Sequence, residues 1–315
     1  MFCIASFLIL SILGIFSASN RQLAKEALDC VLRRVTFRPC TTGFDQKMKA
    51  KLVGGVLTRS ETAAGFINKN FEIIAWVFVV LLAVSSFFAI RGTYYFYVYG
   101  SCNGLNQSGF CAFDPKGTNN AVSTIPLQCS ENPPTAADLT IKPMDITLFP
   151  QKNREESDKL VFIGCYACDY SRLAYPVIMN LIEKNPVNFV FAHYPVKEKS
   201  NYLSLVGECV AQQNPEKLWD LNEILFTVEK TKLEDESYIQ EMVSAIGVDL
   251  PKFNECLQDP AIEVKVKTQI EQITKTGIFG TPTVFINGDA LVGPKPFRVY
   301  AIKLAGFFYW LKYFN

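Results

Sequence analysis

The sequence contains only one histidine, His193, and almost no net charge. A single histidine excludes metal sites built from several imidazoles and argues against a Ser-His-Asp hydrolase. The 31 lysines and arginines nearly balance the 30 aspartates and glutamates. This balance argues against a nucleic-acid partner held by bulk charge. With 49% hydrophobic and 19% charged residues, disorder over most of the chain is excluded.

Cysteine, in contrast, is abundant, with ten residues in a chain of 315. Such a number indicates an oxidising compartment for at least part of the protein. At about 150 residues per domain, the length predicts about two domains. The charge distribution agrees with a division, because residues 1–91 carry 11 basic and 5 acidic side chains, whereas residues 92–315 carry 20 and 25.

Two apolar runs, residues 2–19 and 73–90, each contain 18 residues without a charge. Each is long enough to cross a bilayer as a helix. The loop between them, residues 20–71, holds ten lysines and arginines, so the positive-inside rule places it in the cytoplasm and both termini outside. A cleaved signal peptide at the first run, or a missing true start, are the alternatives. Aromatic residues at 94–99 suit a membrane interface or a short strand.

The cysteines that precede the second half are expected on both sides of the membrane. Cys30 and Cys40 lie in the basic loop, where we expect reduced thiols. Residues 100–135 are rich in Gly, Asn, Ser and Pro and predict an irregular linker. Within it, Cys102 and Cys111 close a short segment and are expected to form a disulfide, whereas Cys129 has no obvious partner.

The second half alternates between strand and helix patterns. Apolar strands are expected at 160–164 and 188–192, with an amphipathic helix at 172–183 between them. Helices follow at 202–213, 217–228, 237–246 and 262–275. A hairpin then joins strands 283–286 and 290–292 through Asn287-Gly288, and a final helix covers 296–313.

Two motifs carry chemistry. Cys165 and Cys168 form a C-x-x-C sequence directly after the first strand, where a following helix N-terminus can stabilise a thiolate. The second motif is Gly280-Thr281-Pro282-Thr283, where a proline before a strand suits a cis peptide bond facing the site. Together they predict thiol–disulfide chemistry, with no metal.

These motifs, with Pro176 in the first helix and a helical insertion containing Trp219, make residues 158–313 resemble the DsbA-like branch of the thioredoxin superfamily. The whole arrangement is similar to membrane-anchored DsbA-like proteins. The resemblance implies an α/β thioredoxin fold with a helical insertion, a disulfide between Cys209 and Cys256, and disulfide exchange with extracytoplasmic cysteine-containing proteins, without a cofactor.

The expected organisation is therefore as follows: transmembrane helices at 1–19 and 72–91, a basic cytoplasmic loop at 20–71, an extracytoplasmic linker with cysteines at 92–150, and a DsbA-like thioredoxin domain at 151–315. The protein is expected to be a multi-pass protein of the cell membrane.

The register of the cysteine motif departs from the family. In the family, a proline follows the attacking cysteine by eight residues and the resolving one by five. Counting back from Pro176 reaches Cys168 and Ser171, so a serine stands at the usual resolving position. Three interpretations remain: Cys165 and Cys168 form a displaced dithiol pair, Cys168 works as a single thiol, or the two form a fixed disulfide. The acid that the family often carries before the motif is replaced by Phe162.

The interpretation that we follow is a membrane-anchored thiol–disulfide oxidoreductase. Cys168 is the expected nucleophile, Cys165 resolves the mixed disulfide, and Thr281 and Pro282 orient the substrate. His193 is expected to be structural. Two alternatives are a non-catalytic, chaperone-like peptide-binding module and a redox relay that passes electrons through Cys129 or Cys3 to a membrane partner.

Overall fold

The protein is described by a computed structural model that covers residues 18–36, 38, 44–58, 60–125, 136–196 and 200–313. The chain divides into two compact units, residues 1–91 and 92–315. The second unit therefore begins within a long helix, immediately after the second apolar run, and includes the segment predicted as a linker.

The first unit is helical, with α2 (Ala18–Val35), α3 (Phe44–Leu57) and most of α4 (Glu61–Tyr99). Among the described residues, one helix is long and apolar enough to cross a membrane, at Trp76–Tyr99. Most of the predicted first span, residues 2–19, lies outside the described part of the chain. The aromatic residues at 94–99 are helical, so the alternative of a short strand there is wrong.

Cys30 differs from expectation. It is fully buried in α2 and disulfide-bonded rather than reduced. Disulfides persist in oxidising compartments, so this bond does not fit the cytoplasmic environment predicted for residues 20–71. The placement of that loop stays a prediction, and Cys40 lies outside the described residues.

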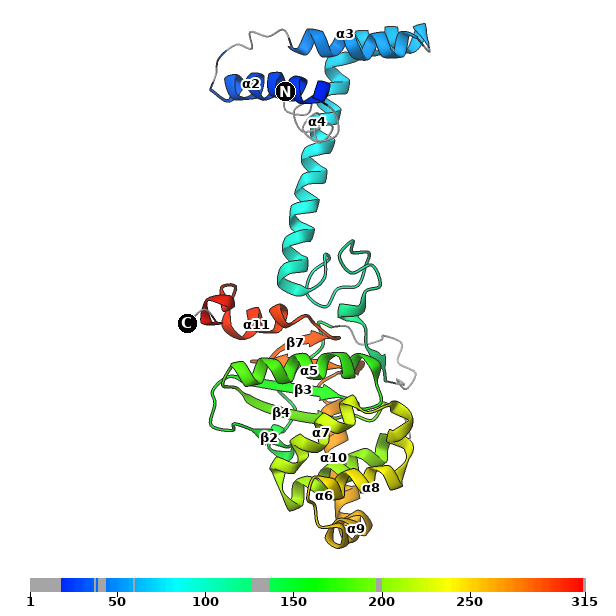
Figure 1. Ribbon diagram of the computed structural model, residues 1–315, viewed down its shortest axis with the longest axis vertical. Helices are drawn as coiled ribbons and strands as arrows, with labels where there is room; N and C mark the ends of the chain where they lie inside the picture. The colour runs from blue at the N-terminus through cyan, green and yellow to red at the C-terminus, as the bar shows by residue number, and fades with distance from the viewer. Residues whose placement is uncertain are drawn as a thin grey trace. The chain divides into compact units, whose positions relative to one another are not determined.

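A five-stranded sheet forms the centre of the second unit, with the strand order β2-β4-β3-β6-β7. The strands are β2 (Gln151–Lys152), β3 (Lys159–Gly164), β4 (Asn188–His193), β6 (Thr283–Ile286) and β7 (Asp289–Val292). Strands β3 and β4 run parallel (Figure 1), whereas β6 is antiparallel to β3, and β7 is antiparallel to β6. This β-α-β, helical insertion, β-β-α order is a thioredoxin fold with a helical insertion, as the sequence predicts.

Alternation along the strands divides the core between the two faces of the sheet. Leu160 and Phe162 belong to one cluster of buried side chains, together with residues of α5 and the insertion. Val161 and Ile163 belong to a second cluster on the opposite face. Successive strand side chains point to opposite faces, so the near-continuous apolar run of β3 buries both sides of the sheet.

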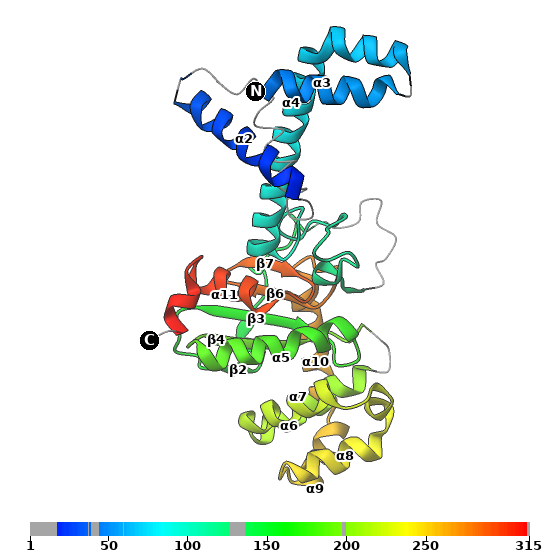
Figure 2. The same ribbon diagram turned by 45° about the horizontal axis from the view of Figure 1, so that its top comes forward.

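The helices of the second unit match the predicted segments, with one addition. They are α5 (Asp169–Lys184), α6 (Asn201–Gln213), α7 (Pro215–Thr227), α8 (Glu236–Ala245), α9 (Leu250–Gln258), α10 (Pro260–Thr274) and α11 (Phe297–Ala305). The helix α9 is not among the predicted segments. The sequence does contain a signal for it, because the Asp249 side chain accepts a hydrogen bond from the Lys252 N–H and aspartate is a preferred N-cap residue. In both views α6 to α9 gather at one end of this unit, away from β7 (Figures 1 and 2).

The final predicted helix is interrupted. It was expected to cover residues 296–313, but α11 stops at Ala305, and a short 3-10 helix, η5 (Tyr309–Tyr313), follows. Gly306 has φ +85° and ψ 175°, an extended conformation with positive φ that is essentially restricted to glycine, and it ends the helix.

The segment predicted as a linker is docked on the sheet. The Asn106 side chain donates to the Ala290 carbonyl at 2.7 Å and accepts from the Val292 N–H at 2.8 Å, so it continues the edge of β7. Its amide is therefore occupied within the fold, although Asn106 begins a glycosylation sequon. Cys102 and Cys111 form a disulfide beside it, with an S–S distance of 2.02 Å.

The second disulfide, Cys209–Cys256, joins α6 to α9 across a sequence separation of 47 residues. We expect replacement of both cysteines by serine to lower the free energy of unfolding by about 2–4 kcal/mol, because a long loop is no longer closed in the unfolded chain. Denaturant unfolding of the full chain in detergent measures this loss. The comparison is a variant in which serine replaces both Cys102 and Cys111, because the disulfide that it removes closes a much shorter loop. Equal or larger destabilisation by that comparison variant contradicts the prediction.

Candidate functional site

Both cysteines of the C-x-x-C motif lie where β3 passes into α5. Cys165 follows the last residue of the strand, and Cys168 is the N-cap residue of the helix. A turn links them, because the Cys168 N–H donates to the Cys165 carbonyl at 3.1 Å. Both are free thiols, and they are 0% and 1% exposed. The pair therefore stands at the positive end of a helix, where a thiolate is stabilised.

Ser171 occupies the first turn of α5 and is fully buried. Its hydroxyl oxygen accepts a hydrogen bond from the backbone N–H of Cys165 at 3.2 Å. The serine thus holds the loop that carries Cys165. A hydroxyl cannot form a disulfide, so among the described residues the thiol available to Cys168 at this site is that of Cys165.

The Thr281–Pro282 peptide bond is cis. Thr281 ends the short strand β5 (Gly280–Thr281), and its side chain lies close enough to the Cys168 thiol to lower the pKa of that thiol. The Pro282 carbonyl accepts from the Gly293 N–H at 2.9 Å, which fixes this turn against the end of β7. The structure therefore brings the two predicted motifs together at the same end of the neighbouring strands β3 and β6.

His193, which is expected from the sequence to be structural, lies beside the cysteine pair. It ends β4 in register with Gly164, so its ring comes next to Cys165, where it lowers the pKa of that thiol. Its Nδ1 lies 2.7 Å from the Ser204 hydroxyl oxygen, and its ring packs on Tyr166 with centroids 4.4 Å apart. A signal was available, because the carboxyl ends of neighbouring parallel strands meet at one edge of a sheet.

The two sulfurs have unequal electrostatic surroundings. The pKa of Cys165 is lowered because the Cys168 thiol donates a hydrogen bond to its sulfur, and the neighbouring His193 lowers it further. The pKa of Cys168 is raised by its proton-donating bond to Cys165, by burial and by the charge on Cys165. Deprotonation is therefore favoured at Cys165 and disfavoured at Cys168.

The loop between the cysteines is clamped to the helical insertion. The Arg172 guanidinium donates to the Tyr166 carbonyl at 3.1 Å, to the Leu225 carbonyl at 2.8 Å, and also to the Val228 carbonyl. The Tyr166 hydroxyl donates to Asn222 of α7. These bonds fix the backbone between the two sulfurs.

A buried acid is present, although not in the strand position that the family resemblance suggests. Tyr166, His193, Ser204 and Glu208 line one cavity of about 30 Å³, which is enough for a water molecule. The Glu208 side chain is 6% exposed and ion-paired with Lys265. Phe162, at the expected position of the acid, packs in the aromatic core instead.

The remaining site predictions have mixed outcomes. The pair Cys209–Cys256 is present as a disulfide. Cys3 and Cys129, the proposed relay residues, lie outside the described part of the chain. In the part of the chain that the structure describes, no group of three or more His, Cys, Asp or Glu side chains could hold a metal ion.

Comparison with known families gives one matching model. Residues 209–305 match the model of the DSBA-like thioredoxin domain. The matched range contains Thr281 and Pro282 but neither Cys165 nor Cys168.

Curated relatives are distant. The Na(+)/H(+) antiporter NhaA 3 of Salinispora tropica is 23% identical over 143 residues, which are 45% of this chain and 22% of that protein. The probable disulfide bond formation protein D of Bacillus anthracis is 22% identical over 142 residues, 42% of this chain and 65% of that protein. The chain thus spans about a fifth of the length of the antiporter relatives.

Solved structures align with about half of the chain. The thiol-disulfide exchange protein alpha-DsbA2 from Wolbachia pipientis has a TM-score of 0.45 and 24% identity, covering 50% of this chain and 85% of that one. Oxidised BdbD from Bacillus subtilis has a TM-score of 0.44 and 18% identity, covering 55% and 96%.

The unequal thiols generate a prediction about pH. A lowered pKa for Cys165 stabilises the reduced fold above the pKa of an unfolded cysteine, about 8.5, and this stabilisation is lost as pH falls through the folded value. The raised pKa of Cys168 acts oppositely, since the unfolded chain loses that proton first above about pH 8.5. We expect the stability of the reduced protein to rise from acid pH to about 8.5 and then fall.

Two measurements check this. Unfolding of the reduced chain as a function of pH gives the profile, and the ultraviolet absorbance of the thiolate should persist at neutral pH. The Cys165→Ser variant is the control and should lose that neutral-pH absorbance. An absorbance that appears only in alkaline solution contradicts the assignment of the charge.

Proposed function

We propose that this chain, whose C-terminal unit resembles the DSBA-like thioredoxin domain, is a thiol–disulfide oxidoreductase that works through Cys165 and Cys168. The observation that carries the proposal is the meeting of two free thiols at a helix N-terminus with a cis-proline turn. Two neighbouring thiols can close to a disulfide and reopen, so the pair itself carries two electrons and requires no cofactor.

Cys168 is the sulfur that exchanges with the substrate, because it lies beside Thr281 and the cis-proline turn. In the oxidising direction, a substrate thiolate attacks Cys168 Sγ of the closed pair, the Cys165–Cys168 bond breaks, and Cys165 leaves as a thiolate. A second substrate thiolate then attacks the substrate sulfur of the mixed disulfide. Cys168 leaves and takes up a proton, so the substrate gains a disulfide and the pair gains two electrons.

In the reverse direction the same residues exchange roles. Cys168 becomes the nucleophile and Cys165 resolves the mixed disulfide, which is the assignment predicted from the sequence. The lowered pKa of Cys165 makes it a good leaving group and stabilises the reduced form of the pair. Both effects favour oxidation of substrates, so we propose that the protein donates disulfides.

The proposed location is a membrane with the second unit on its oxidising side. The candidate span Trp76–Tyr99 supplies an anchor. The disulfides Cys102–Cys111 and Cys209–Cys256 support an extracytoplasmic environment for this unit. Cysteine-containing extracytoplasmic proteins are the proposed substrates, and a multi-pass arrangement, with a redox partner in the membrane, belongs to the same proposal.

The roles of the two cysteines are tested by single serine variants. Cys168→Ser should abolish oxidation of a dithiol peptide, because no sulfur remains at the substrate position. In the reducing direction, Cys165→Ser should accumulate a mixed disulfide with a peptide disulfide, because the resolving thiol is absent. Mass spectrometry of the trapped species identifies the bonded cysteine. Trapping in Cys168→Ser instead contradicts the assignment.

His193 should tune the redox equilibrium. Replacement by glutamine removes the imidazole that lowers the pKa of Cys165 and should make the pair about tenfold less oxidising in equilibrium with glutathione, or about 30 mV lower in potential. The Ser204→Ala control leaves the imidazole in place and should change the equilibrium less. An unchanged equilibrium in His193→Gln shows that the ring does not stabilise the thiolate.

A further inference from the structure

The strand before the cis-proline already has a partner within the same chain. Ser123 pairs with Thr281, and Thr124 with Gly280, in an antiparallel ladder between β1 (Ser123–Thr124) and β5. The Ile125 N–H extends the ladder by donating to the Phe279 carbonyl at 3.0 Å. Residues 121–125 are here called the strap. The strap pairs with β5 in a separate two-stranded sheet that lies next to the thiols.

Two glycines are fitted to the strap. A Cβ atom on Gly280 would lie 2.5 Å from the Val122 side chain and 2.9 Å from the Ser123 carbonyl oxygen. A Cβ on Gly293 would lie 2.7 Å from the Asn120 carbonyl carbon. Such distances are far below van der Waals contact, so both positions require glycine for the strap to approach this closely.

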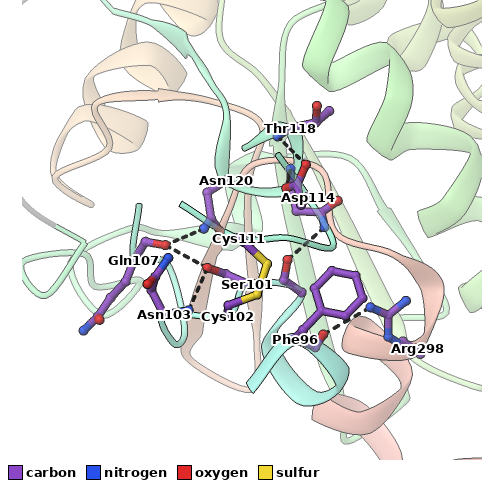
Figure 3. Close-up of a disulfide and its surroundings, with 12 residues drawn as sticks. Phe96, Ser101, Cys102, Asn103, Gln107, Cys111, Asp114, Thr118, Asn120 and Arg298 are labelled. Atoms are coloured by element: carbon purple, nitrogen blue, oxygen red, sulfur yellow. Dashed lines mark hydrogen bonds between the residues drawn. A yellow bond between two sulfur atoms is a disulfide. The ribbon is translucent and has the colours of Figure 1, made fainter. Parts of the chain in front are cut away.

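The base of the strap is fixed by hydrogen bonds and a disulfide. Asp114 accepts from the Thr118 N–H at 3.0 Å and from the Asn119 N–H at 2.9 Å. The Asn120 side chain donates to the Gln107 carbonyl at 2.7 Å, close to the Cys102–Cys111 bridge (Figure 3). The buried ammonium of Lys295 donates to the same asparagine from the other side. The segment that leads into the strap is therefore anchored independently of β5.

The strap covers the reactive sulfur. Ser123 lies opposite Thr281, and the side chains of both residues reach the Cys168 thiol. Cys168 is 1% exposed, so a substrate sulfur cannot reach it in this arrangement of the chain, in which Ser123 of the strap is one of its neighbours. A hydroxyl group, which cannot form a disulfide, stands beside the thiol that the proposed reaction uses.

We infer that the strap fills, within its own chain, the binding place of an extended substrate segment, and that Ser123 stands where the substrate cysteine enters. This inference rests on the proposed function and adds to it a segment of the same chain that competes with substrate. The substrate is an extended polypeptide segment that pairs with β5 through its backbone and presents a cysteine to Cys168. It must displace the strap, and the backbone hydrogen bonds lost with the strap are replaced by those of the substrate.

The position of Ser123 is tested by Ser123→Cys in the full chain, after closure of the Cys165–Cys168 pair with oxidised glutathione. The new thiolate should attack Cys168 Sγ, release Cys165 as a thiolate and leave a disulfide between position 123 and Cys168. Peptide mapping by mass spectrometry detects this bond. Thr124→Cys is the matched control, because neighbouring strand side chains point to opposite faces and Thr124 is exposed. No bond from position 123, or an equal yield from position 124, overturns the inference.

Competition with substrate is tested by Ile125→Pro, which removes the N–H that donates to Phe279. The probe is a peptide that copies residues 121–125 with cysteine in place of Ser123. Mixed disulfide formation between this peptide and Cys168 should become about fivefold faster than in the wild type, as expected for the loss of one backbone hydrogen bond.

The outcomes separate the two proposals. If the wild type exchanges with the peptide and Ile125→Pro is no faster, the strap does not compete with substrate, so the inference fails while the proposed function stands. If neither protein exchanges with the peptide or with a dithiol substrate, the proposed function fails and the substrate role of the strap fails with it.

Discussion

The parallel pairing of β3 with β4 places Gly164 beside His193, and the whole site depends on this register. The pairing sets the point at which the chain leaves the sheet, so Cys165 comes next to the only imidazole of the protein. A shift by one residue would turn every side chain of β4 to the opposite face. The apolar residues of β4 are buried on both faces, and this burial holds the register that the chemistry requires.

Because residue 171 is a serine, the second thiol of the site comes from Cys165, upstream of the helix. The helix N-cap position belongs to Cys168, beside the cis-proline turn, and the second thiol lies upstream in the turn that leaves β3. Ser171 supports that upstream turn through its hydroxyl. The lowered pKa belongs to Cys165, whereas the position beside the cis-proline turn belongs to Cys168. The proposed attack at Cys168, with release of Cys165 as a thiolate, rests on this separation.

The segment between the apolar helix and the sheet is part of the second unit. Asn106 continues the edge of β7, and the strap continues the edge of β5. Unpaired strand edges can associate with other chains. Here these edges of β7 and β5 are occupied by residues of the same chain. The same backbone groups that could bind an extended substrate are thereby protected while no substrate is present.

The sequence by itself determined the strands and most helices of the second unit, because apolar periodicity, proline and capping residues act over a few positions. It also placed Cys165, Cys168, Thr281 and Pro282 in one site, since the order of strands along the chain predicts a shared sheet edge. Tertiary structure alone decided the contact of His193 with Cys165, the buried Glu208 near it and the strap over Cys168. Comparison of the carboxyl ends of β3 and β4 could have predicted that His193 lies near Cys165. The pKa of each cysteine could not be predicted in this way, because it depends on distances and burial. The strap's two-residue strand has no periodicity to detect, because backbone pairing with a distant segment defines it rather than its own side chains.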